Sequence, residues 1–268
     1  MSRLHLRQSQ PDRQHRLIHV TPESAGWDYV GFDLYRLRAG ESASASTETR
    51  EHCLVFVAGR GKAEAAGSNV GALGERQDPF SGKPWSLYVP AGSGWQVVAE
   101  TDLELAVCSA PGVAGSRPPR VIGPDSHGII TRGKGANVRY VTDIINENDP
   151  ADGLLVVEVI TPAGNASSYP PHKHDTDNLP AESSLEETYY HRLDPPQGFA
   201  FQRVYTGDRT IDQALAVEDH DVVLVPRGYH PVAVPYGYTS YYLNVMAGPK
   251  REWHFKNDPA HEWLLKGR

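Results

Sequence analysis

The sequence predicts an all-β protein made of two similar halves. Short runs of alternating apolar and polar residues recur along the chain, and glycine-rich turns separate them. No segment sustains the periodicity of an amphipathic helix. The 25 glycines and 21 prolines agree with a turn-rich chain, and 268 residues suit two domains. We therefore expect two β-sandwiches or barrels.

The first half is predicted to end near a Pro/Gly/Arg-rich stretch at residues 111–119, so that the domains span residues 1–115 and 116–268. A run of small residues, 41–47, is expected to end the first strand. The strands of this half are predicted at residues 28–37, 53–57, 62–65, 85–89, 96–98 and 103–108.

The second half repeats this plan. Its strands are predicted at residues 133–145, 154–161, 187–192, 201–206, 222–226 and 240–246, followed by a short helix or loop at 251–263. A Pro-x-Gly turn follows a strand in each half, at Pro90-Ala-Gly92 and at Pro226-Arg-Gly228. The two turns suggest an internal duplication.

Composition argues against several function classes. The formal net charge is -7 and no Lys/Arg run occurs, so nothing indicates a nucleic-acid partner. No window approaches the ~18 apolar residues of a membrane span, and the N-terminus lacks the apolar region of a signal peptide. We expect a cytoplasmic protein without a membrane partner. Cys53 and Cys108 are expected to be buried thiols.

A candidate metal site lies in the second half. His172 and His174 are two residues apart, and such side chains point to the same face of a strand. Glu187 opens a probable strand, and His230 follows the turn at Pro226. Three imidazoles and one carboxylate suit Zn or Mn, with Fe, Co or Ni as alternatives. Glu186 competes with Glu187, which we prefer because it shares a face with Tyr189 and His191.

This pattern resembles the cupin superfamily. The glycine, H-x-H and glutamate of the first cupin motif match Gly164, His172, His174 and Glu187, and the second motif matches Pro226, Gly228 and His230. The gap between His174 and Glu187 is longer than usual, with residues 175–184 as an expected inserted loop. His220 stands where the second motif often has a glycine, and Val234 where it often has an asparagine.

The first half lacks these ligands. Small residues occupy 42–46, and Ser93-Gly94-Trp95 follows the Pro-x-Gly turn where a histidine would be expected. Glu51 and His52 have no partners nearby and are interpreted as structural or surface residues. We predict a metal-free first barrel that serves as a scaffold, lid or oligomer contact.

Longer stretches resemble the 5-deoxy-glucuronate isomerase family. They are residues 168–175, 185–192, 202–206, 221–232 and 241–249, with Trp253, 257–259 and 261–263. The resemblance is close over most of residues 130–263. It implies a bicupin, that is, two double-stranded β-helix (jelly-roll) barrels. It also implies conversion of 5-deoxy-D-glucuronate to 2-deoxy-5-keto-D-gluconate in myo-inositol catabolism.

An aldose–ketose isomerase moves hydrogen between two neighbouring carbons, and a divalent metal can polarise the carbonyl for this step. Glu187, a metal-bound hydroxide, His191 or Tyr189 are the candidate proton carriers. A hydride shift would need no such base, and the sequence leaves that choice open.

The substrate of this family carries a carboxylate, which the planar fork of arginine suits. Arg203 is the first candidate, followed by Arg227 and by Lys173, which is expected to point away from the metal face. Tyr189, Tyr242 and Asn244 are candidates for binding the sugar hydroxyls.

Three other functions stay open at this point. They are a metal-dependent cupin dioxygenase, the related 5-keto-4-deoxyuronate isomerase, and a non-catalytic sugar-binding cupin. The retained ligands argue against the last of these. The sequence does not fix the oligomeric state, although bicupins often form homo-oligomers.

Overall fold

The computed structural model describes residues 3–126 and 128–266, and strands dominate it. Two compact units divide the chain. The N-terminal unit comprises the described parts of 8–128 and 143–156, and the C-terminal unit those of 1–7, 129–142 and 157–268. A single boundary after residue 115 is thus coarser than the observed division, in which each unit takes segments from more than one part of the chain.

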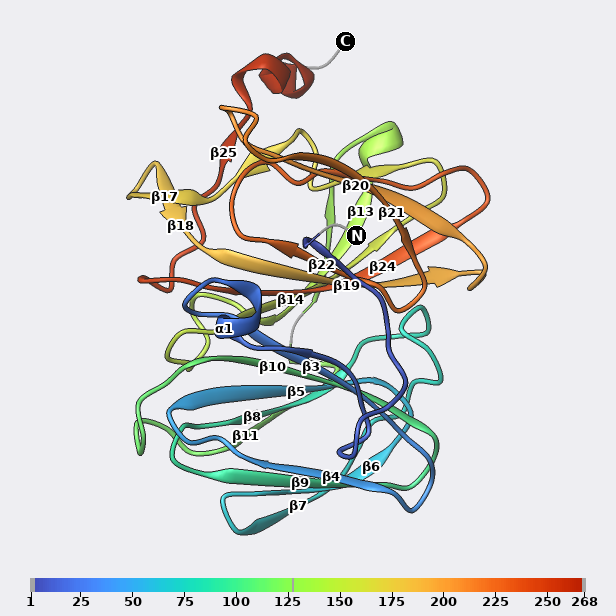
Figure 1. Cartoon of the computed structure of the whole chain (residues 1–268). Coiled ribbons are helices and arrows are strands. Elements are labelled where there is room, and N and C mark those ends of the chain that lie inside the picture. The colour runs from blue at the N-terminus through green and yellow to red at the C-terminus, as the bar shows by residue number, and fades with distance from the viewer. Residues whose placement is uncertain (1–2, 127, 267–268) are drawn as a thin grey trace. The chain divides into compact units, whose positions relative to one another are not determined.

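Two sheets build the N-terminal unit (Figure 1). The first has the order β11-β8-β5-β10-β3-β2 and the second β4-β9-β6-β7. Their strands are β2 (Arg16–Val20), β3 (Gly31–Leu37), β4 (Ser42–Ser46), β5 (Arg50–Ala58), β6 (Gly61–Ala65), β7 (Ser68–Leu73), β8 (Trp85–Val89), β9 (Gly94–Ala99), β10 (Leu103–Pro111) and β11 (Arg120–Ile122), with one short helix, α1 (Pro22–Ala25). Phe56 and Leu105 of one sheet share a buried cluster with Trp95 and Val97 of the other.

Two details expected for this unit are wrong, namely that residues 41–47 only end a strand and that Glu51 has no partners, whereas the structural role of Glu51 is confirmed. The small-residue run does more than end a strand, because Ser42–Ser46 forms β4 and pairs with β9. Glu51 is a fully buried carboxylate. It accepts hydrogen bonds from the Tyr88 hydroxyl (2.6 Å) and from the backbone N–H groups of residues 152, 153 and 154 (2.7, 2.6 and 2.6 Å). Both cysteines are buried and free, as predicted.

The C-terminal unit also contains two larger sheets, with the orders β1-β22-β19-β24-β14-β13-β12 and β15-β23-β20-β21 (Figure 1). The strands are β1 (His5–Leu6), β12 (Ile129–Arg132), β13 (Arg139–Ile145), β14 (Leu155–Thr161), β15 (Ala166–Ser167), β19 (Glu186–Asp194), β20 (Phe199–Tyr205), β21 (Asp212–Glu218), β22 (Val222–Val225), β23 (Val232–Ala233) and β24 (Thr239–Ala247). The unit boundaries fall within β13 and β14.

Smaller elements surround these sheets. β16 (His172–Lys173) pairs with β25 (Lys256–Asn257), and β17 (Asp175–Asn178) pairs with β18 (Glu182–Ser184). The expected inserted loop at 175–184 is therefore largely a hairpin. The short 3₁₀ helices η1 (Gly135–Asn137) and η2 (Pro259–Lys266) complete the unit.

Strand pairing shows that the two units follow one plan. β5 lies between β8 and β10, just as β19 lies between β22 and β24. Val89 and Val225 precede the two Pro-x-Gly turns, and they pair with His52 and Glu187 respectively. His52 is thus the counterpart of Glu187. Its Nδ1 lies 2.9 Å from the Trp95 Nε1, which donates a hydrogen bond. Whether the N-terminal unit binds a metal stays a prediction.

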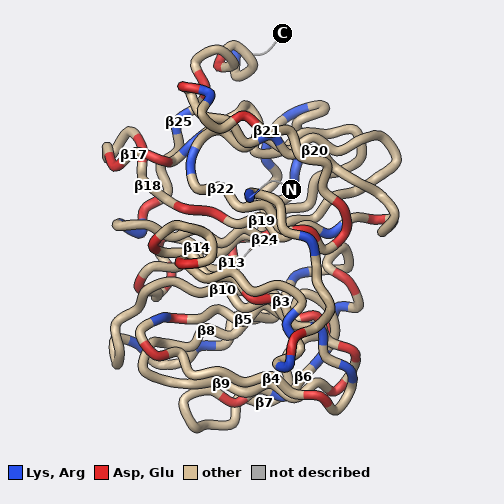
Figure 2. Tube along the Cα trace, in the orientation of Figure 1, with Lys and Arg blue, Asp and Glu red and all other residues tan. Residues whose placement is uncertain are grey.

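The charged residues form no extended block of one sign along the described chain. Figure 2 shows Lys and Arg interspersed with Asp and Glu in both units. The described part of the chain contains no helix with the length and apolarity needed to cross a bilayer.

Candidate metal centre

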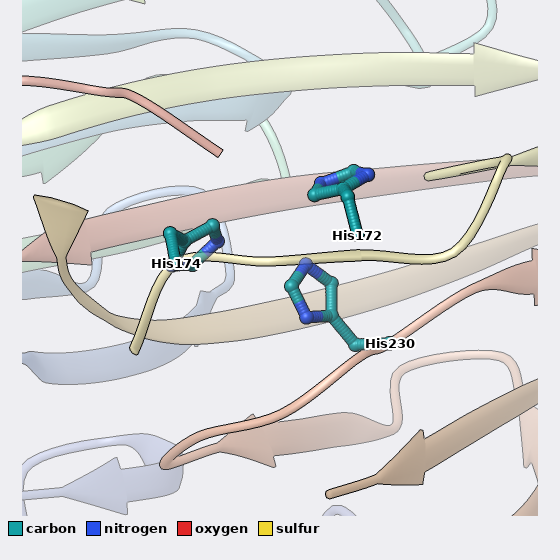
Figure 3. Close-up of side chains that lie close together, drawn as sticks. All are labelled: His172, His174 and His230. Carbon is teal, nitrogen blue, oxygen red and sulfur yellow. The ribbon is translucent and has the colours of Figure 1, made fainter. Parts of the chain in front are cut away.

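Three histidines converge in the C-terminal unit. His172 and His174 come from one segment and His230 from another, which follows the Pro226 turn (Figure 3). The ligand atoms that these three residues offer all lie within 4.8 Å of one another. The H-x-H spacing and the turn thus place the three imidazoles as the sequence predicts.

Glu187 completes the cluster from β19. Its Oε2 lies 3.1 Å from His174 Nε2 and 3.2 Å from His230 Nε2. Glu187 also lines a cavity that Glu186 does not reach. This placement favours Glu187 as the carboxylate of the centre.

Hydrogen bonds to the backbone orient the three histidine rings. His174 Nδ1 lies 3.1 Å from Leu185 O, His230 Nδ1 lies 2.8 Å from Gly228 O, and His172 hydrogen-bonds the backbone of Pro170. Such bonds fix the ring orientation and direct the second nitrogen inward. His230 Nε2 is buried and forms no hydrogen bond among the described residues, although Glu187 Oε2 lies 3.2 Å away. A bound cation would satisfy it, so the donor set fits a divalent metal.

Burial sets the charge state of two of these rings. It lowers the pKa of His172 and of His230 to about 3, with neighbouring histidines acting in the same direction. Neutral imidazole is the form that binds metals. For His174, burial is the largest single influence and acts to lower the pKa, but the hydrogen bond to Glu187, the charge of Glu187 and the backbone bond at Leu185 together outweigh it, and the pKa is raised.

Lys173 points away from the cluster and forms ion pairs with two carboxylates. Its Nζ contacts the Asp175 carboxylate and lies 2.6 Å from Glu182 Oε1. Asp175 Oδ2 in turn accepts a hydrogen bond from Gly228 N–H (2.8 Å). The network connects the His172–His174 segment to the turn that carries His230. Lys173 does not line the cavity, so its placement does not support the predicted contact with substrate.

A cavity of about 350 Å³ opens beside the cluster, a size typical of small-molecule sites. His172, Glu187, Tyr189, Tyr242 and Asn244 line it, together with Arg132, Gly133, Asn137, Arg139, Val141, Val157, Val159, Ser168, Tyr169, Pro170, Trp253, Phe255, Asn257 and Leu265. The Tyr189 hydroxyl lies 3.0 Å from Ser168 Oγ. Burial raises the pKa of Tyr189 well above its ordinary value, so the hydroxyl keeps its proton at neutral pH.

Three other residues predicted to bind substrate or to act in catalysis lie outside this cavity. Arg203 forms a two-pronged ion pair with Asp212 (2.9 Å each), and its guanidinium lies over the Tyr205 ring. Arg227 is exposed and donates to Thr210. His191 is fully buried, with its Nε2 2.9 Å from Gln202 Oε1. Strand alternation explains why Arg203 points outward, because the neighbouring Gln202 takes the inward position.

Sequence reasoning missed the two arginines that line the cavity, Arg132 and Arg139. Arg139 lies within a predicted strand, but no motif marks it. The sequence signal that could have identified it is its position in the alternation of the strand. Arg139 and Val141 are two residues apart and both line the cavity, so an arginine in phase with a buried valine indicates an inward-facing charge.

Two β-sandwich units of one plan, with three histidines and a glutamate beside a cavity in the second, define a bicupin with a candidate metal centre. The sequence model of the KduI/IolB family matches residues 4–264, and the chain belongs to this family.

Several known proteins are similar to this chain over nearly its full length. The 5-deoxy-glucuronate isomerase of Geobacillus kaustophilus is 51% identical over 100% of this chain and 97% of its own. That of Bacillus subtilis strain 168 is 49% identical over 94% and 93%. An IolB-like protein of Salmonella typhimurium LT2, solved by crystallography, superposes with a TM-score of 0.94 at 50% identity, covering 98% and 99%. A mutant oxalate decarboxylase of Bacillus subtilis shares the fold alone, with a TM-score of 0.63 at 12% identity over 96% and 80%.

Proposed function

We propose that this protein is a metal-dependent aldose–ketose isomerase that converts 5-deoxy-D-glucuronate to 2-deoxy-5-keto-D-gluconate, a step of myo-inositol catabolism. The observation that carries the proposal is the sequence identity of about 50%, over nearly the whole chain, with relatives named 5-deoxy-glucuronate isomerase. The cluster of His172, His174, His230 and Glu187 beside a cavity supports it, because such a reaction needs a polarised carbonyl.

The residues of the cavity suit the chemistry. His172, His174, His230 and Glu187 would hold a divalent metal, which supplies Lewis-acid polarisation of the substrate carbonyl when bound. Glu187 lines the cavity wall and is our candidate for moving the proton between the two carbons. Tyr189 keeps its hydroxyl proton and can donate a hydrogen bond to an oxygen on which negative charge develops.

His191 does not share this role. Its ring is bonded to Gln202 and does not line the cavity. We propose that it supports the wall behind Tyr189, whose ring is stacked on it at a centroid distance of 6.0 Å. Tyr242 and Asn244 remain candidates for the sugar hydroxyls, because both line the cavity.

The metal is proposed as Zn or Mn. The B. subtilis oxalate decarboxylase, which shares only the fold, has Mn(II) centres. Mixed imidazole and carboxylate ligands accept several first-row metals. A cytoplasmic location and a homo-oligomeric state belong to the same proposal; the oligomeric state rests on the frequent association of bicupins, because the sequence does not fix it.

An anaerobic isomerisation assay tests the function. The protein is stripped with a chelator, reloaded with Zn, Mn or Fe, and mixed with 5-deoxy-D-glucuronate while ketose formation is followed. We expect turnover that depends on metal and disappears in His174→Ala. Turnover that appears only when O2 is admitted would indicate a dioxygenase, and faster turnover of 5-keto-4-deoxyuronate in a parallel assay would indicate the related uronate isomerase.

A further inference from the structure

Two arginines face the cavity from neighbouring strands. Arg132 ends β12 and Arg139 begins β13, and the antiparallel register pairs them directly. Both side chains line the cavity that His172 and Glu187 also line. Like charges placed opposite each other in a sheet are destabilising. Such an arrangement therefore suggests a ligand that offsets the repulsion.

Neither arginine has an acidic partner among the described residues. The Arg139 Nη1 donates to Asn137 O (3.1 Å), and the Arg132 guanidinium lies 5.7 Å from the centre of the Trp253 ring. Arg192 and Arg203 of the same unit do have acidic partners. Arg192 contacts Asp219 (2.8 Å) and Arg203 contacts Asp212. Glu187 is the one acid among the described residues that line the cavity, and its carboxylate contacts His174 of the histidine cluster.

The turn between the two strands packs closely against the Arg139 side chain. Gly133 has a φ of 85°, and a Cβ there would lie 1.8 Å from Asn137 O and 2.8 Å from Arg139 Nη1. A side chain at residue 133 would therefore displace the turn. Asn137 also presents a buried Oδ1 that has no hydrogen-bond partner within the described chain. Burial and the neighbouring Arg132 lower the pKa of Arg139, which agrees with a guanidinium that lacks a counter-ion.

The sheet order separates these arginines from the metal cluster. β24 and β14 lie between β19, which carries Glu187, and β13, which carries Arg139. With ~4.8 Å between neighbouring strands, the two backbones are about 14 Å apart along the sheet. An arginine side chain spans part of this distance. The remainder suits a short polyol chain that has its carbonyl at one end and its charge at the other.

We propose that Arg139 and Arg132 bind the carboxylate of the sugar acid, and that this contact directs the carbonyl end of the substrate to the metal cluster. The inference deepens the proposed function and rests on it for the identity of the substrate. Two guanidinium groups match a carboxylate in charge and in planar geometry. The assignment replaces Arg203, Arg227 and Lys173 as the carboxylate site.

The test compares acidic and neutral ligands of the metal-loaded protein. We would measure kcat and KM of Arg139→Gln, Arg139→Lys and Arg132→Gln on 5-deoxy-D-glucuronate and on 5-deoxy-D-glucose, which carries CH2OH in place of the carboxylate. Arg209→Gln is the matched control, because Arg209 pairs with Asp212 (3.3 Å) outside the cavity. Binding of D-glucuronate and D-glucose, measured by calorimetry, gives a readout that is independent of turnover.

We expect Arg139→Gln to raise KM for the acid about 10- to 100-fold, as the loss of one charge-assisted contact implies. The preference for acid over neutral ligand should fall by the same factor, and Arg139→Lys should restore part of it. Unchanged acid preference in both arginine variants, in a folded protein that turns over the acid, would overturn the carboxylate site and leave the isomerase intact. Binding of D-glucuronate that weakens in these variants, without any wild-type turnover of 5-deoxy-D-glucuronate, would keep the site and overturn the proposed reaction.

Discussion

Lys173→Met should weaken the metal centre without removing a ligand. Lys173 lies between the two histidines of the H-x-H pair, and its Nζ is held by Asp175 and Glu182. The exposed fractions of the three side chains are 18%, 16% and 5%, so the substitution leaves two largely buried carboxylates without their cation. Breaking a buried pair in this way costs ~3–5 kcal/mol. Partial exposure of Lys173 reduces the expected loss of unfolding free energy to about 2–4 kcal/mol.

Metal affinity should fall at the same time. Asp175 also accepts the Gly228 N–H bond, so its reorientation would shift the turn that carries His230. Residues that hold metal ligands from behind change affinity by ~10- to 100-fold when replaced. We would measure affinity by chelator competition and stability by urea unfolding.

The matched control is Lys250→Met. Lys250 pairs with Asp177 at 3.2 Å, but these side chains are 53% and 47% exposed, and such surface pairs contribute ~0–1 kcal/mol. If Lys173→Met matched this control in both metal affinity and stability, the network would not position the centre and the reasoning would be refuted.

Three further predictions follow from the same geometry. Arg203→Gln should leave KM for the sugar acid within about twofold, since its ion pair with Asp212 lies outside the cavity; a KM rise beyond about tenfold in steady-state assays would return Arg203 to the site. Tyr189→Phe should lower kcat ~10- to 1000-fold through loss of a hydrogen-bond donor, with metal content unchanged by elemental analysis; an unaltered kcat would exclude that role. Glu51→Gln should reduce the unfolding free energy by ~2–4 kcal/mol, because a neutral amide cannot accept all of its hydrogen bonds. Urea unfolding with the exposed Glu64→Gln as control tests this, and equal stabilities would contradict it.

The convergence of the three histidines could be predicted because its signals are local. The two-residue spacing of His172 and His174 fixes a shared face, and the Pro226 turn fixes where His230 enters. Glu187 could be chosen over Glu186 by strand alternation alone. Each of these inferences depends on only a few neighbouring residues.

The carboxylate site was not predictable in this way. The sequence favours Arg203 because it lies on a predicted strand, but a one-residue change of phase reverses the face of a strand. The alternation at β20 buries Gln202 and exposes Arg203. Arg132 and Arg139 face the cavity because β12 and β13 join the sheet beside β14, and such long-range pairing is not encoded in any single motif.

The division into units was also only partly visible in the sequence. Glycine turns and short apolar runs indicated two all-β halves. The pairing of β1 with β22 joins segments from opposite ends of the chain and gives no local signal. β4 alternates serine with alanine, but it lacks the β-branched and aromatic residues that identify other strands.

The central claim is that His172, His174, His230 and Glu187 hold a metal on which the isomerisation depends. The most direct test is the anaerobic turnover of 5-deoxy-D-glucuronate by chelator-stripped protein, before and after metal is restored. The account predicts that activity is lost on stripping, returns with a divalent metal and does not return in His174→Ala. Full activity of the stripped, folded wild-type protein, with metal absent by elemental analysis, would contradict it.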